Sequence, residues 1–474
     1  MSPEIQNMID NSLAGFSEEN SFNEYARRIA WDRQRYWLLN ETGEWKKLDK
    51  DSLTESLEVY GAFRWTGAVT GKDEKAAAKR AFEKRLRTAA RDQNEICFVG
   101  QMAGYQKGIH VHKGDKYLCT KGYSLIKPEN REFPTIQGLL MQLFGEEQIH
   151  YLHSWLKGAY ESLEAGEKRA GQVLIIAGVP DIGKSFIKEF IIRRILGGRY
   201  CEPGPCLQGL TRFNSDLAEN ESWELDDSVG VSGTDQRNLY GSAFKKLAAN
   251  SDHRVEAKGR DAAQLPPLFH RLSIYTNVDN ASLWVIPALT EGSLADKAIV
   301  LKAEKPENPI VKLPSPEERP AFREKVSEEL PGYVNWLTSE YETPKHIKNN
   351  RYGVKAYQHP ELKGQLEAMS DEGRLRSMID DLIFESGRAK KTWEGTGGEL
   401  EKQLRIAARE DLRDKDLEKI LRYSQAFVQL LSKLKGKGVE KKRMWDGPNR
   451  GKRVWVVQAP EEWGAPELDL KDGE

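Results

Sequence analysis

The sequence contains little cysteine, no long apolar run and no excess of charge of one sign. Four cysteines among 474 residues cannot form a disulfide scaffold, which excludes a small disulfide-rich secreted domain and favours a reducing compartment. The longest uncharged apolar run, Val173–Pro180, has eight residues, well short of the ~18 that a membrane helix needs. The N-terminus carries Glu4 and Asp10 and no apolar core segment, so we expect no signal peptide and a cytoplasmic protein without membrane contact.

The charge balance excludes a cationic coat over the whole protein. Lysine and arginine total 72, aspartate and glutamate total 73, and the formal net charge is -1, so any nucleic-acid surface must be a local basic patch. Hydrophobic residues make up 39% of the chain, enough to bury sizeable cores and to exclude a disordered chain. At about 100–200 residues per domain, the length predicts roughly two to four domains.

The cysteines could take part in a metal site only at unusual spacings. Cys201 and Cys206 are close in sequence but lack a second pair of ligands. A zinc site is conceivable from four residues of the N-terminal region, namely Cys97, His110, His112 and Cys119. Because these residues contain no tight ligand pair of the usual spacing, we favour two core thiols beside a surface hairpin.

Residues 1–125 are expected to form a small α+β domain. Turn residues separate two pairs of apolar runs, which predicts hairpins of Tyr36–Leu39 with Trp45–Leu48 and of Ile109–His112 with Lys116–Cys119. Between them, Lys72–Arg91 has the pattern of a helix with eight basic and three acidic side chains. That helix is either an ordinary solvated surface or a surface that contacts phosphates.

The middle of the chain is typical of an α/β protein. Apolar spacing predicts helix over Thr135–Glu167, within a helical collar at 126–170. Val173–Ala177 is a continuous apolar run, as in a parallel sheet that is buried on both faces, and strands and helices alternate over 171–303. Five prolines between Lys305 and Pro320 mark a linker, and a helix follows, so 304–369 is predicted to be a linker and helical segment.

A phosphate-binding loop of the form GxxxxGK[ST] follows the apolar strand. The residues after the loop have helical spacing, which completes the strand–loop–helix context that the motif requires. The glycines let backbone N–H groups turn toward a β-phosphate, Lys184 reaches the β and γ phosphates, and the Ser185 hydroxyl ligates Mg²⁺. We therefore expect ATP and Mg²⁺ to bind here, with contacts from Gly178, Pro180, Asp181, Ile182, Gly183, Lys184, Ser185 and Phe186.

Two later segments supply the polar partners that such a loop needs. Trp223–Ser228 contains Asp226, which we assign to the metal, and Asp227, which we assign to the attacking water, although this order can be reversed. The other interpretation of this segment is an ordinary acidic turn. Arg271–Asn277 is typical of a strand that ends in a polar residue, and the amide of Asn277 could contact the γ-phosphate and the water.

This order of motifs resembles that of the superfamily 3 helicases, over roughly 130–460 of this chain. The resemblance implies a hexameric AAA+-like ring motor of viruses, phages and mobile elements. In that family a basic segment precedes the Asn-ended strand, and here it implies that Lys258, with Arg260 beside it, grips single-stranded DNA in the central channel. From the residues alone, the segment is only a turn, and its alternative interpretation is a solvated loop. Glu329–Trp336 also resembles the helical segment after the motor in poxvirus-type and phage primase-helicases.

The residue that would act on a neighbouring subunit departs from the family pattern. The resemblance implies an Asp-Arg pair some twenty residues after the Asn-ended strand, and the matching pair here is Asp296-Lys297. Lysine keeps the charge but lacks the planar guanidinium. Lys297 is the predicted trans catalytic residue, with Arg260 or Arg271 in that role, or a slow motor, as alternatives. The remaining alternative is a surface lysine at the start of a strand.

Residues 370–460 are expected to form a winged helix, and 461–474 an acidic tail. The predicted elements are helices over Arg374–Glu385, from Trp393 and over Ser424–Leu434, and strands at Val439–Trp445 and Lys452–Val457. The segment 433–453 holds nine basic and two acidic residues, which suits phosphate contact by Lys433, Lys435, Lys437, Arg443, Arg450, Lys452 and Arg453. The alternative is a solvated wing without a ligand.

The sequence therefore predicts an α/β fold with a P-loop AAA+-like motor. We expect an ATP-dependent DNA helicase for the replication of a phage, prophage or satellite element in a prokaryotic host cell. It would act as a homo-hexamer on single-stranded and duplex DNA, with replication proteins as further partners. The alternative is an ATP-switched DNA-binding initiator, loader or regulator that unwinds nothing. Residues 1–125 carry no Cys-rich zinc ribbon and no paired-acid strand motif, so a fused primase is not expected.

Overall fold

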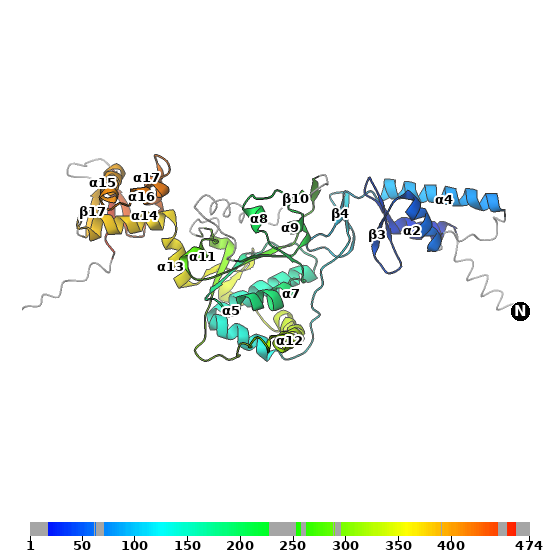
Figure 1. The fold of residues 1–474 in the computed structure, drawn as a ribbon, viewed down its shortest axis with the longest axis horizontal. Helices are drawn as coiled ribbons and strands as arrows, with labels where there is room; N and C mark the ends of the chain where they lie inside the picture. Colours follow the sequence, from blue (N-terminus) through cyan, green and yellow to red (C-terminus); the bar gives the residue numbers. More distant parts are fainter. Residues whose placement is uncertain are drawn as a thin grey trace, which may run out of the picture.

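The structure is a computed structural model that describes residues 18–60, 62, 71–226, 253–256, 262–287, 289, 295–389, 391–443 and 453–460. Its elements form three groups along the long axis of the molecule (Figure 1). The N-terminal elements lie at one end, a central group surrounds a six-stranded sheet, and the C-terminal helices lie at the other end. Within the described ranges, none of the helices is both long and apolar enough to cross a membrane.

The central sheet has six parallel strands in the order β16-β13-β7-β12-β9-β8. Their bounds are β7 (Val173–Gly178), β8 (Tyr200–Cys201), β9 (Ser222–Asp226), β12 (Arg271–Thr276), β13 (Ala298–Ala303) and β16 (Tyr357–Gln358). Gly178 is paired with Ala303, and Thr276 with Ala177, so the carboxyl ends of the three middle strands meet at one edge. The mixed α/β class that the sequence predicted is confirmed.

Helices cover both faces of this sheet. Leu174 and Ile176 of β7 belong to one core and Ile175 belongs to another, so the strand is buried on both sides, as its unbroken apolar run predicted. The first core contains α5 (Pro134–Glu164), α6 (Lys184–Ile187), the π-helical η1 (Lys188–Ile192), α7 (Arg193–Ile195) and α12 (Arg319–Ser339). The second core contains α8 (Gly204–Leu207), α11 (Asn280–Leu283) and α13 (Pro360–Ala368).

Both hairpins predicted in the N-terminal region are present. One core joins α2 (Glu18–Arg28), β1 (Ile29–Trp31), β2 (Tyr36–Leu39), β3 (Trp45–Leu48), α3 (Lys50–Val59) and α4 (Lys72–Gln93). A second sheet, in the order β4-β6-β5, contains β4 (Phe98–Gly100), β5 (Gly108–His112) and β6 (Asp115–Cys119). Its core is shared with α9 (Ser215–Glu219), β10 (His253–Val255) and β11 (Ala263–Leu265), so this sheet packs against the central group.

The C-terminal group differs from the prediction at its second helix. The helix expected from Trp393 begins at Gly397, because Thr392–Gly395 pairs with a neighbouring strand and Thr396 caps the helix reciprocally with Glu399. The sheet has three strands in the order β17-β19-β18, where two were predicted. The elements are α14 (Asp371–Ile379), η4 (Asp380–Glu385), β17 (Thr392–Gly395), α15 (Gly397–Glu410), α16 (Asp414–Ile420), α17 (Ala426–Lys433), β18 (Val439–Arg443) and β19 (Arg453–Gln458).

The chain around β13 and β16 also contains short elements. They are η2 (Ala295–Lys297), η3 (Lys345–Ile347), β14 (Lys348–Asn349) and β15 (Gly353–Val354). The 31-residue helix α5 is interrupted at Gly145, whose φ of 61° lies in the left-handed region that glycine adopts without strain. The prediction of one helix over Thr135–Glu167 therefore had the right extent but did not include the break.

Candidate functional site

The loop predicted to bind phosphate joins the end of β7 to the start of α6. Gly178 lies so close to β13 that a Cβ atom there would come within 2.9 Å of the carbonyl oxygen of Ala303. The backbone then turns at Asp181, with φ of 60°, and at Gly183, with φ of 102°, before the helix begins at Lys184. Left-handed turns of this kind direct successive N–H groups toward one side, as a bound phosphate requires.

Lys184 connects the loop with the neighbouring strand. Its Nζ donates to the carbonyl oxygens of Gly178 at 2.7 Å and Val179 at 2.8 Å, and to Asn277 Oδ1 at 3.0 Å. Asn277 directly follows β12, which lies next to β7 in the sheet. The fold thus brings together two predicted site residues that are 93 positions apart in the sequence.

Asp226 ends β9 at the same edge of the sheet. Its side chain is 46% exposed, and its two carboxylate oxygens accept hydrogen bonds from Lys188 Nζ at 2.7 Å and 3.0 Å. Lys188 is buried in the helix that follows the loop. The sequence prediction did not include Lys188, although a lysine among the apolar residues of Phe186–Ile192 was a signal that could have identified it. Asp227 lies outside the described residues.

The residues at this edge fit a polyphosphate and a magnesium ion. The ammonium of Lys184 already contacts oxygens that a phosphate oxygen can replace, and Ser185 is exposed at the start of the helix. The first helical turn also leaves N–H groups without acceptors inside the helix. Mg²⁺ usually keeps several waters and takes one or two carboxylates besides phosphates. Ser185 and Asp226 carry side-chain oxygens at this edge that would suit it.

Further acid–base pairs join β9 and the residue before it to the chain that follows the loop. Glu224 is buried and accepts hydrogen bonds from Arg193 Nε at 3.0 Å and from Arg193 Nη2 at 2.6 Å. Glu221 is fully buried and pairs with Arg199. As far as Asp226, the acidic segment is therefore not an ordinary surface turn, because its carboxylates are held by cations from the neighbouring helix and loop.

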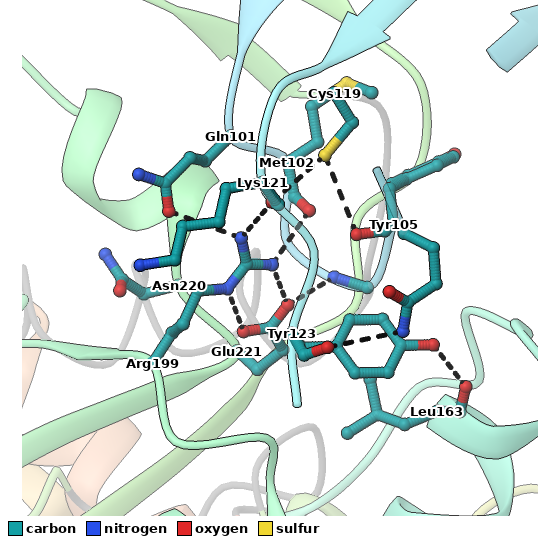
Figure 2. Close-up of polar contacts among 12 residues, drawn as sticks. Gln101, Met102, Tyr105, Cys119, Lys121, Tyr123, Leu163, Arg199, Asn220 and Glu221 are labelled. Carbon is teal, nitrogen blue, oxygen red and sulfur yellow. Dashed lines mark hydrogen bonds and ion pairs between the residues drawn. The ribbon is translucent and has the colours of Figure 1, made fainter. Parts of the chain in front are cut away.

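The pair of Arg199 and Glu221 is the centre of a buried network (Figure 2). The guanidinium of Arg199 donates to the carbonyl oxygens of Lys121 at 2.8 Å and Met102 at 3.1 Å. Glu221 Oε1 accepts a hydrogen bond from the backbone N–H of Gly104 at 2.7 Å. Since Met102, Gly104 and Lys121 lie around the sheet of β4, β5 and β6, the network fastens that sheet to the central one.

Lys297 lies at the amino ends of the central strands, whereas the phosphate loop lies at their carboxyl ends. It directly precedes β13, and Ala298 is paired with Val173 at the start of β7. The length of β7, at about 3.3 Å per residue, separates this position from the loop by roughly 20 Å. Lys297 and the loop are therefore not brought together within one chain.

The alternative trans residues have different surroundings. Arg271 is buried at the start of β12, and its Nη1 donates to the carbonyl oxygen of Arg169 at 2.9 Å. Burial lowers the pKa of Arg271 to about 9. A side chain enclosed in its own chain in this way cannot reach a neighbouring subunit, which argues against Arg271 in that role. Arg260 lies outside the described residues.

The predicted DNA contacts of the C-terminal group are exposed, but some are paired with acids. Lys437 Nζ lies 2.9 Å from Glu367 Oε2, and Lys433 Nζ lies 3.9 Å from Glu372 Oε2. Lys435 is exposed, with Nζ 5.8 Å from the centre of the Trp455 ring. Arg443 and Arg453 stand opposite each other in the antiparallel register of β18 and β19. The acids offset part of the positive charge of this patch. Lys258, Arg260, Arg450 and Lys452 lie outside the described residues.

The cysteines take part in no metal site that the structure describes. Cys97 is exposed and Cys119 is buried, and both are free thiols. The pKa of each thiol is raised, mainly by burial. Over the described part of the chain, no group of three or more histidine, cysteine, aspartate or glutamate residues is arranged to hold a metal ion. The zinc hypothesis therefore finds no support in this geometry.

Comparison with known proteins reveals a similar fold but no related sequence. No protein-family model matches the chain, and no curated protein matches it. The chain is similar to the A-form apo structure of the NrS-1 C-terminal region, with a TM-score of 0.50 and 14% identity over 91% of this chain and 96% of that one. A second apo structure of the same region gives a TM-score of 0.50 at 13% identity, with the same coverage. At these identities the similarity shows the fold alone.

Proposed function

We propose that the protein is an ATP-dependent DNA helicase of superfamily 3 that serves the replication of a phage, prophage or satellite element. One observation carries the proposal: Lys184 Nζ contacts both the loop carbonyls and Asn277 Oδ1, while Asp226 ends the next strand. Polar residues from three separate segments thus meet at the carboxyl edge of the sheet, where open α/β sheets bind their ligands. The order of motifs supports the assignment to superfamily 3.

Each residue at this edge has a chemical role in the proposal. Lys184 exchanges its carbonyl contacts for the β and γ phosphates of ATP and offsets the charge that develops during hydrolysis. Ser185 and Asp226 hold Mg²⁺, which supplies neutralising charge next to the phosphates when it is bound. Asn277 orients the attacking water through its amide, and Asp227, adjacent to Asp226 in the sequence, is the proposed base.

The proposal divides the chain as the sequence predicts. It assigns 1–125 to an N-terminal domain, 126–170 to a collar, 171–303 to the motor, 304–369 to a linker and helical segment, and 370–460 to a winged helix. The helices α14–α17 and the sheet β17-β19-β18 support the last assignment. The motor would act as a hexamer, and the separation of Lys297 from its own loop supports a role on the next subunit. Lys258 and Arg260 would hold single-stranded DNA, and the winged helix would hold duplex DNA.

The second candidate function is an ATP-switched initiator, loader or regulator without unwinding activity. The observation that favours it is the lysine at position 297, because a lysine lacks the planar, bidentate group that stabilises a transferring phosphoryl. A slow hydrolase suits a switch better than it suits a motor.

The site assignment is tested by replacing Lys184 with alanine. We expect ATP hydrolysis to fall by about 10²- to 10³-fold, because the ammonium no longer stabilises charge on the phosphates. Lys325→Ala is the matched control, since Lys325 is an exposed lysine of α12 that has no role in the proposed site, and its loss should leave hydrolysis unchanged. Circular dichroism checks that both variants are folded. Undiminished turnover in folded Lys184→Ala would contradict the assignment.

A further inference from the structure

The helix after the phosphate loop contains a wide turn that changes which of its residues face β9. Lys188–Ile192 is π-helical, and the N–H of Arg193 donates to the carbonyl oxygen of Lys188, five residues earlier. In a regular α-helix, residues five apart point about 140° away from each other at 3.6 residues per turn. The wider π turn brings Lys188 and Arg193 to the same side.

This side of the helix matches the spacing of acids on the strand. Glu224 and Asp226 are two residues apart on β9, so their side chains share one face. Lys188 pairs with Asp226, and Arg193 pairs with Glu224. The π turn therefore allows Lys188 and Arg193 of one helix to pair with Asp226 and Glu224 of one strand at the same time.

The two members of the first pair differ in exposure. The side chain of Lys188 is 9% exposed, whereas that of Asp226 is 46% exposed. The ammonium of Lys188 lies within 3.0 Å of both carboxylate oxygens and 5.7 Å from the centre of the Tyr275 ring. Lys188 thus holds the carboxylate from its inner side, and the outer side stays open to solvent. A buried ammonium that lost its acid would be strongly unfavourable, so the pair should persist when a ligand arrives.

We propose that Lys188 is a positioning residue, which fixes the carboxylate of Asp226 so that its outer side can hold Mg²⁺ bound with nucleotide. The inference rests on the proposed function and names a residue that no sequence motif assigns. Groups that hold a metal ligand from behind fix its orientation, and their loss typically reduces metal affinity or activity by about 10- to 100-fold. Nucleotide binding without metal depends on the loop and Lys184, and it should not depend on Lys188.

The chain provides a matched control for this role. Arg193 lies on the same helix, is mostly buried and pairs with an acid of the same strand. Its partner Glu224, however, is buried within the sheet, two residues before Asp226. Lys188→Met and Arg193→Met each remove one cation and keep an apolar chain of similar length. Both are expected to lower stability, whereas only Lys188→Met should affect the metal.

The experiment compares wild type, Lys188→Met, Lys188→Arg and Arg193→Met by two readouts. The affinity for a fluorescent ADP is measured without divalent cation, and Mn²⁺ binding in the presence of ADP is measured by electron paramagnetic resonance. For Lys188→Met we expect unchanged ADP affinity and Mn²⁺ affinity about 10- to 100-fold weaker. Lys188→Arg, which keeps a cation, should recover most of it, and Arg193→Met should bind Mn²⁺ as wild type does.

Each other outcome overturns the inference. Equal loss of Mn²⁺ affinity in Lys188→Met and Arg193→Met would show a general structural effect, and no loss in Lys188→Met would show that Asp226 needs no anchor. Either result leaves the proposed function intact if wild type binds ADP and Lys184→Ala does not. Wild type that binds no ADP would refute the proposed function and this inference together.

Discussion

Replacing Arg199 with methionine tests whether the network around Glu221 fastens the N-terminal sheet to the central one. The side chain of Glu221 is fully buried and that of Arg199 is 11% exposed, so the substitution leaves a carboxylate without its countercharge inside the protein. Breaking a buried pair by removing one partner costs about 3–5 kcal/mol. The carbonyl oxygens of Lys121 and Met102 lose a donor as well. The cost should fall on the sheet of β4, β5 and β6.

The assay is native-state hydrogen exchange followed by mass spectrometry, because it reports the stability of each segment separately. A loss of about 3–5 kcal/mol, at 1.4 kcal/mol per tenfold change, predicts exchange more than about 100-fold faster in β6. The helix α15 in the C-terminal group serves as the internal reference. Arg169→Met is the control, since Arg169 pairs with Glu167 at the surface, where such pairs contribute little. Unchanged exchange in β6, or equal acceleration in α15, would refute this account of the network.

Three further predictions concern other parts of the chain. Deletion after Met369, which keeps α13 in the central core, should leave ATP hydrolysis intact and weaken the binding of duplex DNA. The slope of log affinity against log salt should flatten by about one unit for each phosphate that the deleted segment neutralises. An unchanged slope would show that DNA binds elsewhere. Lys297→Ala should bind ATP without hydrolysing it, and mixing it with Lys184→Ala should restore part of the ATP hydrolysis. If Lys297→Ala alone hydrolyses ATP normally and the mixture shows no added hydrolysis, the trans residue lies elsewhere. Burial, with a smaller contribution from His150, lowers the pKa of His153 to about 3. Below about pH 6.5 the unfolded chain therefore binds a proton at this histidine that the folded chain does not bind. The free energy of unfolding should fall with decreasing pH between these values, by up to about 1.4 kcal/mol per pH unit. Thermal melting of His153→Gln should depend less on pH over this range than that of wild type, and identical pH dependence would contradict the prediction.

The sequence predicted the parts of the site that depend on local patterns and on the direction of strands. The loop is a contiguous motif, and its two left-handed residues, Asp181 and Gly183, lie inside it. The contact of Lys184 with Asn277 was predictable because adjacent parallel strands end at one edge. The assignment of Asp226 to the same edge follows from the same rule.

The sequence could not predict features that depend on packing between distant segments. The joint pairing of Lys188 with Asp226 and of Arg193 with Glu224 depends on the π turn, which breaks the regular helical periodicity on which sequence interpretation relies. The pair of Arg199 and Glu221 requires the N-terminal sheet to cover both residues. The strand at Thr392–Gly395 resembles the start of a helix in the sequence, because Trp393 fits either pattern until its pairing with β19 is known.

Unwinding of a forked DNA by the purified protein tests the helicase proposal most directly. Strand separation and ATP hydrolysis are measured in the same reaction, with Lys184→Ala as the inactive control. We predict strand separation that requires both ATP and Mg²⁺ and that disappears in Lys184→Ala. DNA-stimulated hydrolysis of ATP without any strand separation would contradict the helicase proposal and support the ATP-switched initiator, loader or regulator.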